Sequence, residues 1–155
     1  MLIQTLKIRR EKLAKLTDKP VFIAAGKRPS RNFPANKYPF RASSHFLYFA
    51  GIGIESAVIQ LAQGKLTLYV DNPHPGSALW HGASPTRDDL AATIGADYTH
   101  PLSELPSVIT NQFDDEIANA IVTLRLQHDD YAISEIRKAV EVTTRSHLQF
   151  HHQID

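Results

Sequence analysis

Hydrophobic residues recur at helical spacing at the start of the chain. Leu2, Leu6, Leu13 and Leu16 share one face, and this spacing predicts an amphipathic helix over residues 3–16. We expect the charged positions to fall largely on the other faces, in solvent: Lys7, Arg10, Glu11 and Lys15.

Six short apolar runs have the length and composition of β-strands. They lie at residues 21–25, 46–49, 56–61, 66–70, 96–98 and 118–122. The run at 21–25 is continuous, which is typical of a strand that is covered on both faces. The runs at 56–61 and 66–70 flank a short segment that contains Gly64, which predicts an antiparallel hairpin.

Helix signals occupy the second half of the chain. Thr86 and Asp89 have capping-box spacing ahead of an apolar segment that ends at Gly95. A further short helix is expected at 103–109. We expect Asp130 to cap a last helix, because apolar residues keep helical spacing beyond it and neither Gly nor Pro interrupts them.

This pattern predicts one α/β domain, a mixed sheet of about six strands flanked by helices on both faces. Its length of 155 residues and its 43% hydrophobic share suit a single core. Residues 27–38 are rich in Pro, Asn, Arg and Ser and lack periodicity. Loops of that length usually have a function or are disordered.

Composition narrows the classes of function. Seventeen Lys and Arg against sixteen Asp and Glu leave a net charge of +1, which argues against a nucleic-acid partner. There is no cysteine, so disulfides and thiolate metal sites are excluded, and a reducing cytoplasm fits. The chain has no apolar run long enough to span a membrane, so we expect a soluble cytoplasmic protein.

Three stretches resemble the N-terminal domain of aminopeptidase P, in the aminopeptidase P, prolidase and creatinase group. Arg31-Asn32 and then residues 38–51, YPFRASSHFLYFAG, are similar to the family's Tyr-Pro-Phe-Arg-Gln-x-Ser-Asp-Phe-x-Tyr-Leu-Thr-Gly signature. Trp80-His81-Gly82 resembles its Trp-x-Gly-x-Arg element. Residues 129–139 resemble the segment that opens the catalytic domain. The departures are His45 for Asp, Ala42 for Gln, Ala50 for Thr and Ser84 for Arg.

The resemblance implies two parts of the chain, an N-terminal domain over residues 1–127 and a truncated start of the pita-bread peptidase domain over 128–155. Members of the family cleave the bond before a proline at the second position of a peptide. They use two divalent metals, usually Mn(II), that Asp, His and Glu residues of the catalytic domain hold. Because those segments follow the last helix in the family, we expect no catalytic residue, metal ligand or cofactor in this chain, and no activity from it alone.

The resemblance also implies four substrate-side residues, each with a structural alternative. Tyr38 forms a pocket wall or packs on the core, and Arg41 binds a carboxylate or locks the loop to an acidic neighbour. His45 contacts substrate or is a surface histidine. Trp80 packs in its own domain or, as in tetrameric relatives, places its ring against the active site of a neighbouring subunit.

Other chemistry is weakly supported. Gly51-Ile52-Gly53 is too short for a dinucleotide loop, and no Gly-x-Ser-x-Gly elbow occurs. His147 and His151 have the spacing of a metal-binding pair, but we favour a solvated helix end as the explanation. The leading hypothesis is therefore a gating and oligomerisation domain of a Xaa-Pro aminopeptidase, in a homo-oligomer or with a catalytic domain. The alternative is a free-standing module that binds a peptide or protein.

Overall fold

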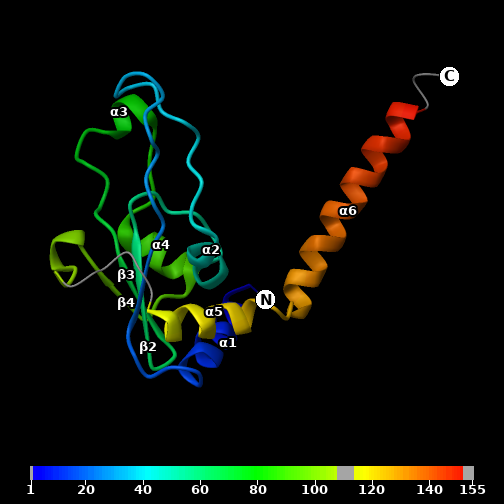
Figure 1. The fold of residues 1–155 in the computed structure, drawn as a ribbon. Helices are drawn as coiled ribbons and strands as arrows, with labels where there is room; N and C mark the ends of the chain where they lie inside the picture. Colours follow the sequence, from blue (N-terminus) through cyan, green and yellow to red (C-terminus); the bar gives the residue numbers. More distant parts are fainter. Residues whose placement is uncertain (1, 108–113, 152–155) are drawn as a thin grey trace. The chain divides into compact units, whose positions relative to one another are not determined.

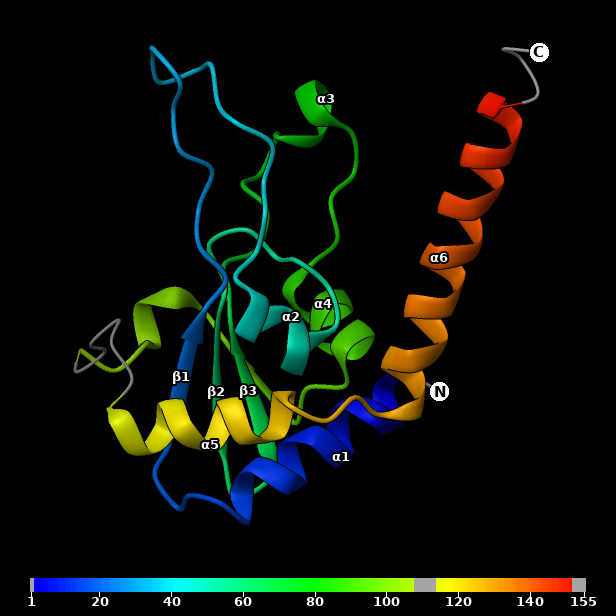
Figure 2. The same ribbon diagram turned by 45° about the vertical axis from the view of Figure 1, so that its right-hand side comes forward.

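A computed structural model describes residues 2–107 and 114–151, and Figures 1 and 2 show its fold. The elements in chain order are α1 (Leu2–Ala14), β1 (Val21–Ala24), α2 (Ser44–Ala50), β2 (Val58–Ala62), β3 (Lys65–Tyr69), α3 (Ala78–His81), α4 (Arg87–Ile94), β4 (Tyr98–His100), the 3-10 helix η1 (Leu102–Glu104), α5 (Asp115–Arg125) and α6 (Asp130–His151). The chain divides after Leu124 into a larger N-terminal unit and a smaller C-terminal unit that contains α6.

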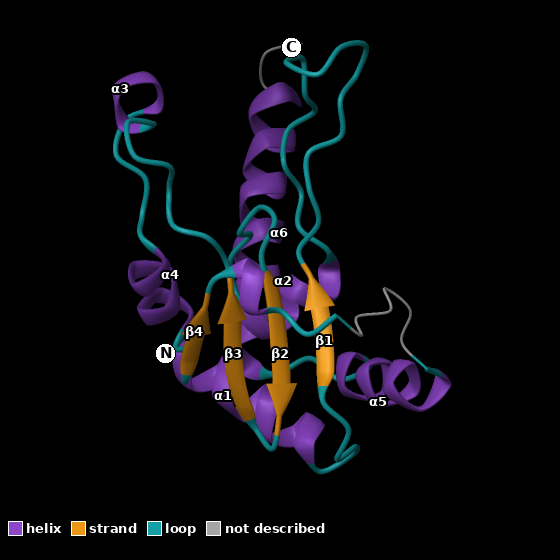
Figure 3. Cartoon of the chain, turned by 90° about the vertical axis from the view of Figure 1, so that its left-hand side faces the viewer, coloured by secondary structure: helices purple, strands orange, loops and turns teal. Residues whose placement is uncertain are grey.

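The sheet is mixed, as predicted, and its described strands have the order β1-β2-β3-β4 (Figure 3). β2 pairs antiparallel with both β1 and β3, whereas β4 pairs parallel with β3. The prediction of about six strands was wrong, because the runs at 46–49 and 118–122 are helical and four strands remain in the described part.

The run at 46–49 lies in α2. The hydroxyl of Ser43 caps this helix by accepting a hydrogen bond from the Phe46 amide at 3.2 Å. Phe46, Phe49 and Ala50 are buried while Leu47 is exposed. This i, i+3, i+4 spacing is typical of a helix. Four consecutive apolar residues are too few to show that spacing in the sequence.

The run at 118–122 lies in α5. Asp114 precedes this helix and accepts a hydrogen bond from the Ile117 amide at 2.9 Å, which is the contact that an N-cap residue makes. Ile117, Ala120 and Ile121 are buried, again at helical spacing.

One face of the sheet forms the core. The strand register aligns six buried side chains on that face: Val21, Ile23, Ile59, Leu61, Leu66 and Leu68. Helices α1, α2 and α5 lie on the same side of the sheet (Figure 1). The prediction of a strand at 21–25 covered on both faces was wrong, because buried and more exposed residues alternate along β1 and Ala24 is exposed.

The predicted hairpin and the predicted helix ends are confirmed. Gln63 and Gly64 both have positive φ, 51° and 78°, as in the two-residue turns that join twisted antiparallel strands. Thr86 and Asp89 form the capping box of α4. Gly95 ends α4 with φ 63°, where a Cβ would come within 2.6 Å of the Ile3 side chain.

Two other helix predictions need correction. The helix expected at 103–109 is a 3-10 turn over Leu102–Glu104, and residues 108 and 109 lie outside the described ranges. The last helix is long, as expected, and Asp130 is its first residue and not its cap. Its cap, however, is the carboxylate of Asp129, which accepts from the Ala132 amide at 2.8 Å.

The prediction that the charged positions of the first helix lie in solvent is confirmed for Lys7, Glu11 and Lys15 but wrong for Arg10. Arg9 and Arg10 are buried. Arg10 donates hydrogen bonds of 2.7–3.2 Å to the carbonyl oxygens of Phe49, Ile94 and Gly95. These carbonyls belong to the C-terminal ends of α2 and α4, which lack intrahelical donors and carry partial negative charge. Arg10 therefore joins α1 to two other helix ends.

Candidate functional site

Two long segments project from the same end of the sheet (Figures 2 and 3). Residues 25–43 follow β1, and residues 70–86 follow β3. Because β1 and β3 both run antiparallel to β2, their carboxyl ends meet the same edge. All four candidate substrate-side residues lie in these segments or directly after them.

The first segment is ordered by its own backbone. Ser30 and Lys37 form an isolated antiparallel bridge. The Arg31 amide donates to Asn36 at 2.8 Å, and the Tyr38 amide donates to Pro29 at 3.0 Å. Prolines also restrict φ within this segment. We refer to residues 27–41 as the basic loop, because it contains five Lys and Arg and no acidic residue.

An ion pair anchors the base of the basic loop. The Arg28 guanidinium lies 2.7 Å from the Glu55 carboxylate, and the hydrogen bond from Arg28 lowers the pKa of Glu55 below its usual range. The Glu55 side chain also accepts from the Arg28 amide at 3.2 Å. Motif reasoning did not single out this pair, because its members are 27 positions apart.

Tyr38 and Arg41 are both exposed on this loop. The Arg31 guanidinium lies 4.7 Å from the centre of the Tyr38 ring, which is a cation–π contact. Tyr38 is thus a surface aromatic, whereas Phe40 packs against the core. Within the described residues Arg41 has no ion pair or hydrogen bond of its side chain, so the loop is not locked through an acidic neighbour there.

His45 lies in the first turn of α2 and is half-buried. It lies two residues after Ser43, whose hydroxyl also donates to the Ala24 carbonyl at 2.9 Å. This contact fixes the start of α2 against the end of β1. His45 therefore lies where the first projecting segment returns to the body of the domain.

Trp80 lies on α3, the four-residue helix of the second projecting segment. Its side chain is 85% exposed, and that of the adjacent Leu79 is 88% exposed. Trp80 is therefore not a core residue of its own unit. Figure 3 shows α3 and the segment that follows β1 standing apart above the same end of the sheet.

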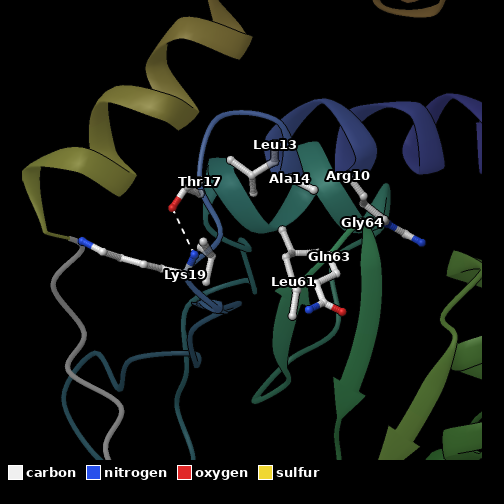
Figure 4. Close-up of a pocket in the computed structure, with 10 residues that line it drawn as sticks. Arg10, Leu13, Ala14, Thr17, Lys19, Leu61, Gln63 and Gly64 are labelled. Atoms are coloured by element: carbon white, nitrogen blue, oxygen red, sulfur yellow. Dashed lines mark hydrogen bonds between the residues drawn. The ribbon is translucent and has the colours of Figure 1, made fainter.

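A small pocket lies at the β2–β3 turn, at the end of the sheet opposite to the projecting segments (Figure 4). Its lining residues are Arg10, Leu13, Ala14, Thr17, Lys19, Val21, Leu61, Ala62, Gln63 and Gly64. Its cavity volume of about 10 Å³ has room for about one water molecule, which is far too small for a small-molecule site. None of the four candidate residues lines it.

The described residues do not fit a metal site. Residues 2–107 and 114–151 contain no group of three or more His, Cys, Asp or Glu that could hold an ion. The proposed pair of His147 and His151 cannot be assessed, because the His151 side chain is outside what the structure describes. Also within these ranges, no helix has the length and apolar character needed to cross a bilayer.

The geometry defines a class of domain, an α/β unit with a mixed sheet, one helix-covered face and two projecting segments. Solved structures share this fold. For aminopeptidase P from E. coli in its low pH form, the TM-score is 0.60 at 19% identity, over 79% of this chain and 33% of that chain.

Sequence comparison identifies the family. Residues 6–121 match the family model described as aminopeptidase P, N-terminal domain, and the chain belongs to that family. An uncharacterized peptidase of Saccharomyces cerevisiae is 24% identical in an alignment of 166 positions that covers 90% of this chain and 31% of that protein. A probable Xaa-Pro aminopeptidase of Talaromyces stipitatus is 27% identical in an alignment of 144 positions that covers 73% of this chain and 31% of that protein. The chain spans about a third of the length of these relatives.

Proposed function

We propose that this chain acts as the non-catalytic N-terminal domain of a cytoplasmic Xaa-Pro aminopeptidase, in which it contributes to subunit contacts and to substrate gating. Membership of the aminopeptidase P N-terminal domain family supports the proposal. The name of the T. stipitatus relative, a probable Xaa-Pro aminopeptidase, gives the activity that we propose for the whole enzyme. Its substrates would be peptides with proline at the second position.

The exposure of Trp80 carries the gating proposal. An aromatic ring buries 150–250 Å² when it is covered, and such rings are frequent anchors at the centres of interfaces. Leu79 adds a second exposed apolar side chain on the same short helix. We propose that Trp80 covers the rim of a neighbouring subunit's active site. Tyr38, Arg41 and His45, which lie on or directly after the other projecting segment, would form part of the wall of the substrate pocket.

Catalysis would come from a separate catalytic domain. We propose that residues 128–155 begin that domain, and the apolar positions Ile133, Ile136 and Val140 of α6 fit a helix that packs on it. Two Mn(II) ions there would polarise the scissile carbonyl. The residues of this chain would orient the peptide and exclude longer ones, which is selection by access to the site.

The first experiment incubates the purified 155-residue chain with Xaa-Pro dipeptides and tripeptides and added manganese. We expect no cleavage. Hydrolysis that is proportional to protein and abolished by chelation would contradict the proposal.

The second experiment tests gating in an enzyme that carries this domain ahead of a catalytic domain. Trp80→Ala should lower kcat/KM for peptides long enough to reach the rim and leave dipeptides unchanged. The matched control is Tyr98→Ala, an exposed aromatic on β4, which should alter neither. Equal loss for short and long peptides would remove the gating role.

The alternative function is a free-standing module that binds a peptide or protein. The projecting basic loop, with its exposed Tyr38 and Arg41, favours it. Binding of a peptide by the purified chain in the absence of any catalytic domain is the observation that separates the two functions.

A further inference from the structure

The basic loop carries positive charge without any acidic residue. No Asp or Glu occurs between Asp18 and Glu55. Five of the chain's seventeen Lys and Arg lie in the basic loop: Lys27, Arg28, Arg31, Lys37 and Arg41. All five are exposed. The net charge of the chain is only +1, but all charged residues of this projecting loop are basic.

Internal contacts leave most of this charge available. Only Arg28, among the five, forms a salt bridge within the described residues, to Glu55. Arg31 stacks on Tyr38 and keeps its charge. Lys27, Lys37 and Arg41 have no salt bridge in the parts of the chain that the structure describes. Like charges held close together repel, and a ligand of opposite charge relieves that repulsion.

The loop is also held in shape before any ligand arrives. The Ser30–Lys37 bridge and the two backbone hydrogen bonds to Asn36 and Pro29 fix its two sides against each other. Three prolines restrict its backbone further. A preformed loop loses less conformational entropy on binding than a flexible one, which favours recognition.

We propose that the basic loop binds an acidic polypeptide segment through carboxylate contacts. Planar guanidinium groups match carboxylates bidentately, and exposed Phe33 and Tyr38 supply apolar surface between the charges. The inference does not depend on the proposed function, since it concerns binding by this chain itself. In a Xaa-Pro aminopeptidase, the same contact would favour substrates with acidic residues beyond the proline.

The surroundings of the basic loop favour a peptide over a nucleic acid. A phosphate backbone needs a positive surface that continues over many charges. The second projecting segment, residues 70–86, contains Asp71 and no Lys or Arg. At the start of α4, which follows it, the half-buried Arg87 is succeeded by Asp88 and Asp89. The positive surface therefore ends at the basic loop, which suits a short acidic peptide.

The test measures binding of a fluorescent decaglutamate peptide to the 155-residue chain by anisotropy. The test variant combines Lys27→Gln, Lys37→Gln and Arg41→Gln, and it keeps the Arg28–Glu55 and Arg31–Tyr38 contacts. The control combines Lys7→Gln, Lys12→Gln and Lys15→Gln, which removes the same charge from two exposed positions of α1 and from the exposed residue directly after it. We expect about tenfold weaker binding in the test variant and less than about twofold change in the control. Added salt should weaken wild-type binding.

Absence of decaglutamate binding, equal loss in both variants, or tighter binding of a thymidine decamer would overturn the proposal. Amide chemical shifts of the wild-type chain give a second readout that requires no variant. On titration with decaglutamate, the shifts should change at residues 27–41, and changes confined to other segments would also overturn it.

Discussion

Trp80 and Phe46 show how exposure separates a surface aromatic from a core aromatic. The only tryptophan in the sequence lies on a four-residue helix and is 85% exposed. Phe46, an aromatic of the resembling motif, is fully buried. The two side chains therefore contribute very differently to folding.

We predict that Trp80→Ala changes the free energy of unfolding by less than about 1 kcal/mol. Phe46→Ala should cost about 3–5 kcal/mol, because it leaves a cavity in the core. Urea or guanidinium unfolding of the purified chain measures both. A loss of several kcal/mol for Trp80→Ala would show that the ring packs within its own domain.

Arg10 connects helix α1 to the C-terminal ends of α2 and α4. Burial lowers its pKa to about 10, and the nearby Asp97 carboxylate opposes this shift. The side chain therefore remains charged at neutral pH. Three backbone carbonyls of α2 and α4 satisfy it.

We predict that Arg10→Met destabilises the fold by about 3 kcal/mol or more, because it leaves these carbonyls without a buried donor. Arg10→Lys should also destabilise, since one ammonium does not reproduce the guanidinium fork. Lys12→Met, at an exposed position of α1, is the control and should stay within about 0.5 kcal/mol. Equal stability of Arg10→Met and Lys12→Met would contradict this account.

At the scale of elements, the capping box of α4 links helix stability to pH. The hydroxyl and the amide of Thr86 both donate to the Asp89 carboxylate, at 2.6 and 2.9 Å. These hydrogen bonds lower the pKa of Asp89 below its ordinary value of 3.8. Since the unfolded chain binds this proton at higher pH, the contribution is complete above 3.8 and is lost as the pH falls through the folded-state pKa.

We predict that the stability of the chain falls as the pH decreases below about 4, and that Asp89→Asn reduces this fall. The amide oxygen of Asn still accepts a hydrogen bond but does not titrate. Denaturant unfolding at a series of pH values provides the measurement. A pH profile of Asp89→Asn that is identical to wild type below pH 4 would mean that Asp89 does not contribute, and that Glu55 and Asp114, whose pKa values are also lowered, cause the fall.

At the scale of the whole molecule, the core belongs to the N-terminal unit. Its buried cluster extends from Leu13 to Ile121, and Leu124 packs against it. Among the described residues, all members of that cluster belong to the N-terminal unit, whereas the C-terminal unit contains α6. Its α6 instead has exposed apolar residues, including Ile136, Val140 and Phe150.

We predict that a chain ending at residue 126 has the same free energy of unfolding as the 155-residue chain, within about 1 kcal/mol. The slope of that free energy against denaturant concentration should also be similar in the two chains, because the same core is exposed on unfolding. Circular dichroism during urea unfolding tests both quantities. A larger loss of stability would show that α6 stabilises the N-terminal unit.

The sequence alone determined the features that depend on local chemistry. The first helix, the hairpin with its Gln63–Gly64 turn, the Thr86–Asp89 capping box and the end of α4 at Gly95 all follow from residue type and spacing. The motif at 38–51 also indicated the family that residues 6–121 match. Each of these depends on neighbours within a few positions, and such contacts are readable along a chain.

The tertiary structure decided what depends on distant partners. A short apolar run fits a strand or a helix equally well, so only the packing of Phe46 and Ile121 in the core resolved the runs at 46–49 and 118–122. Arg10 shares its helix face with Leu6 and Leu13. Its burial depends on carbonyls 39 to 85 positions away, and no local pattern contains them. The location of the candidate residues Arg41 and Trp80 also depends on tertiary structure. The directions of β1 and β3 place the segments that carry them at one end of the sheet.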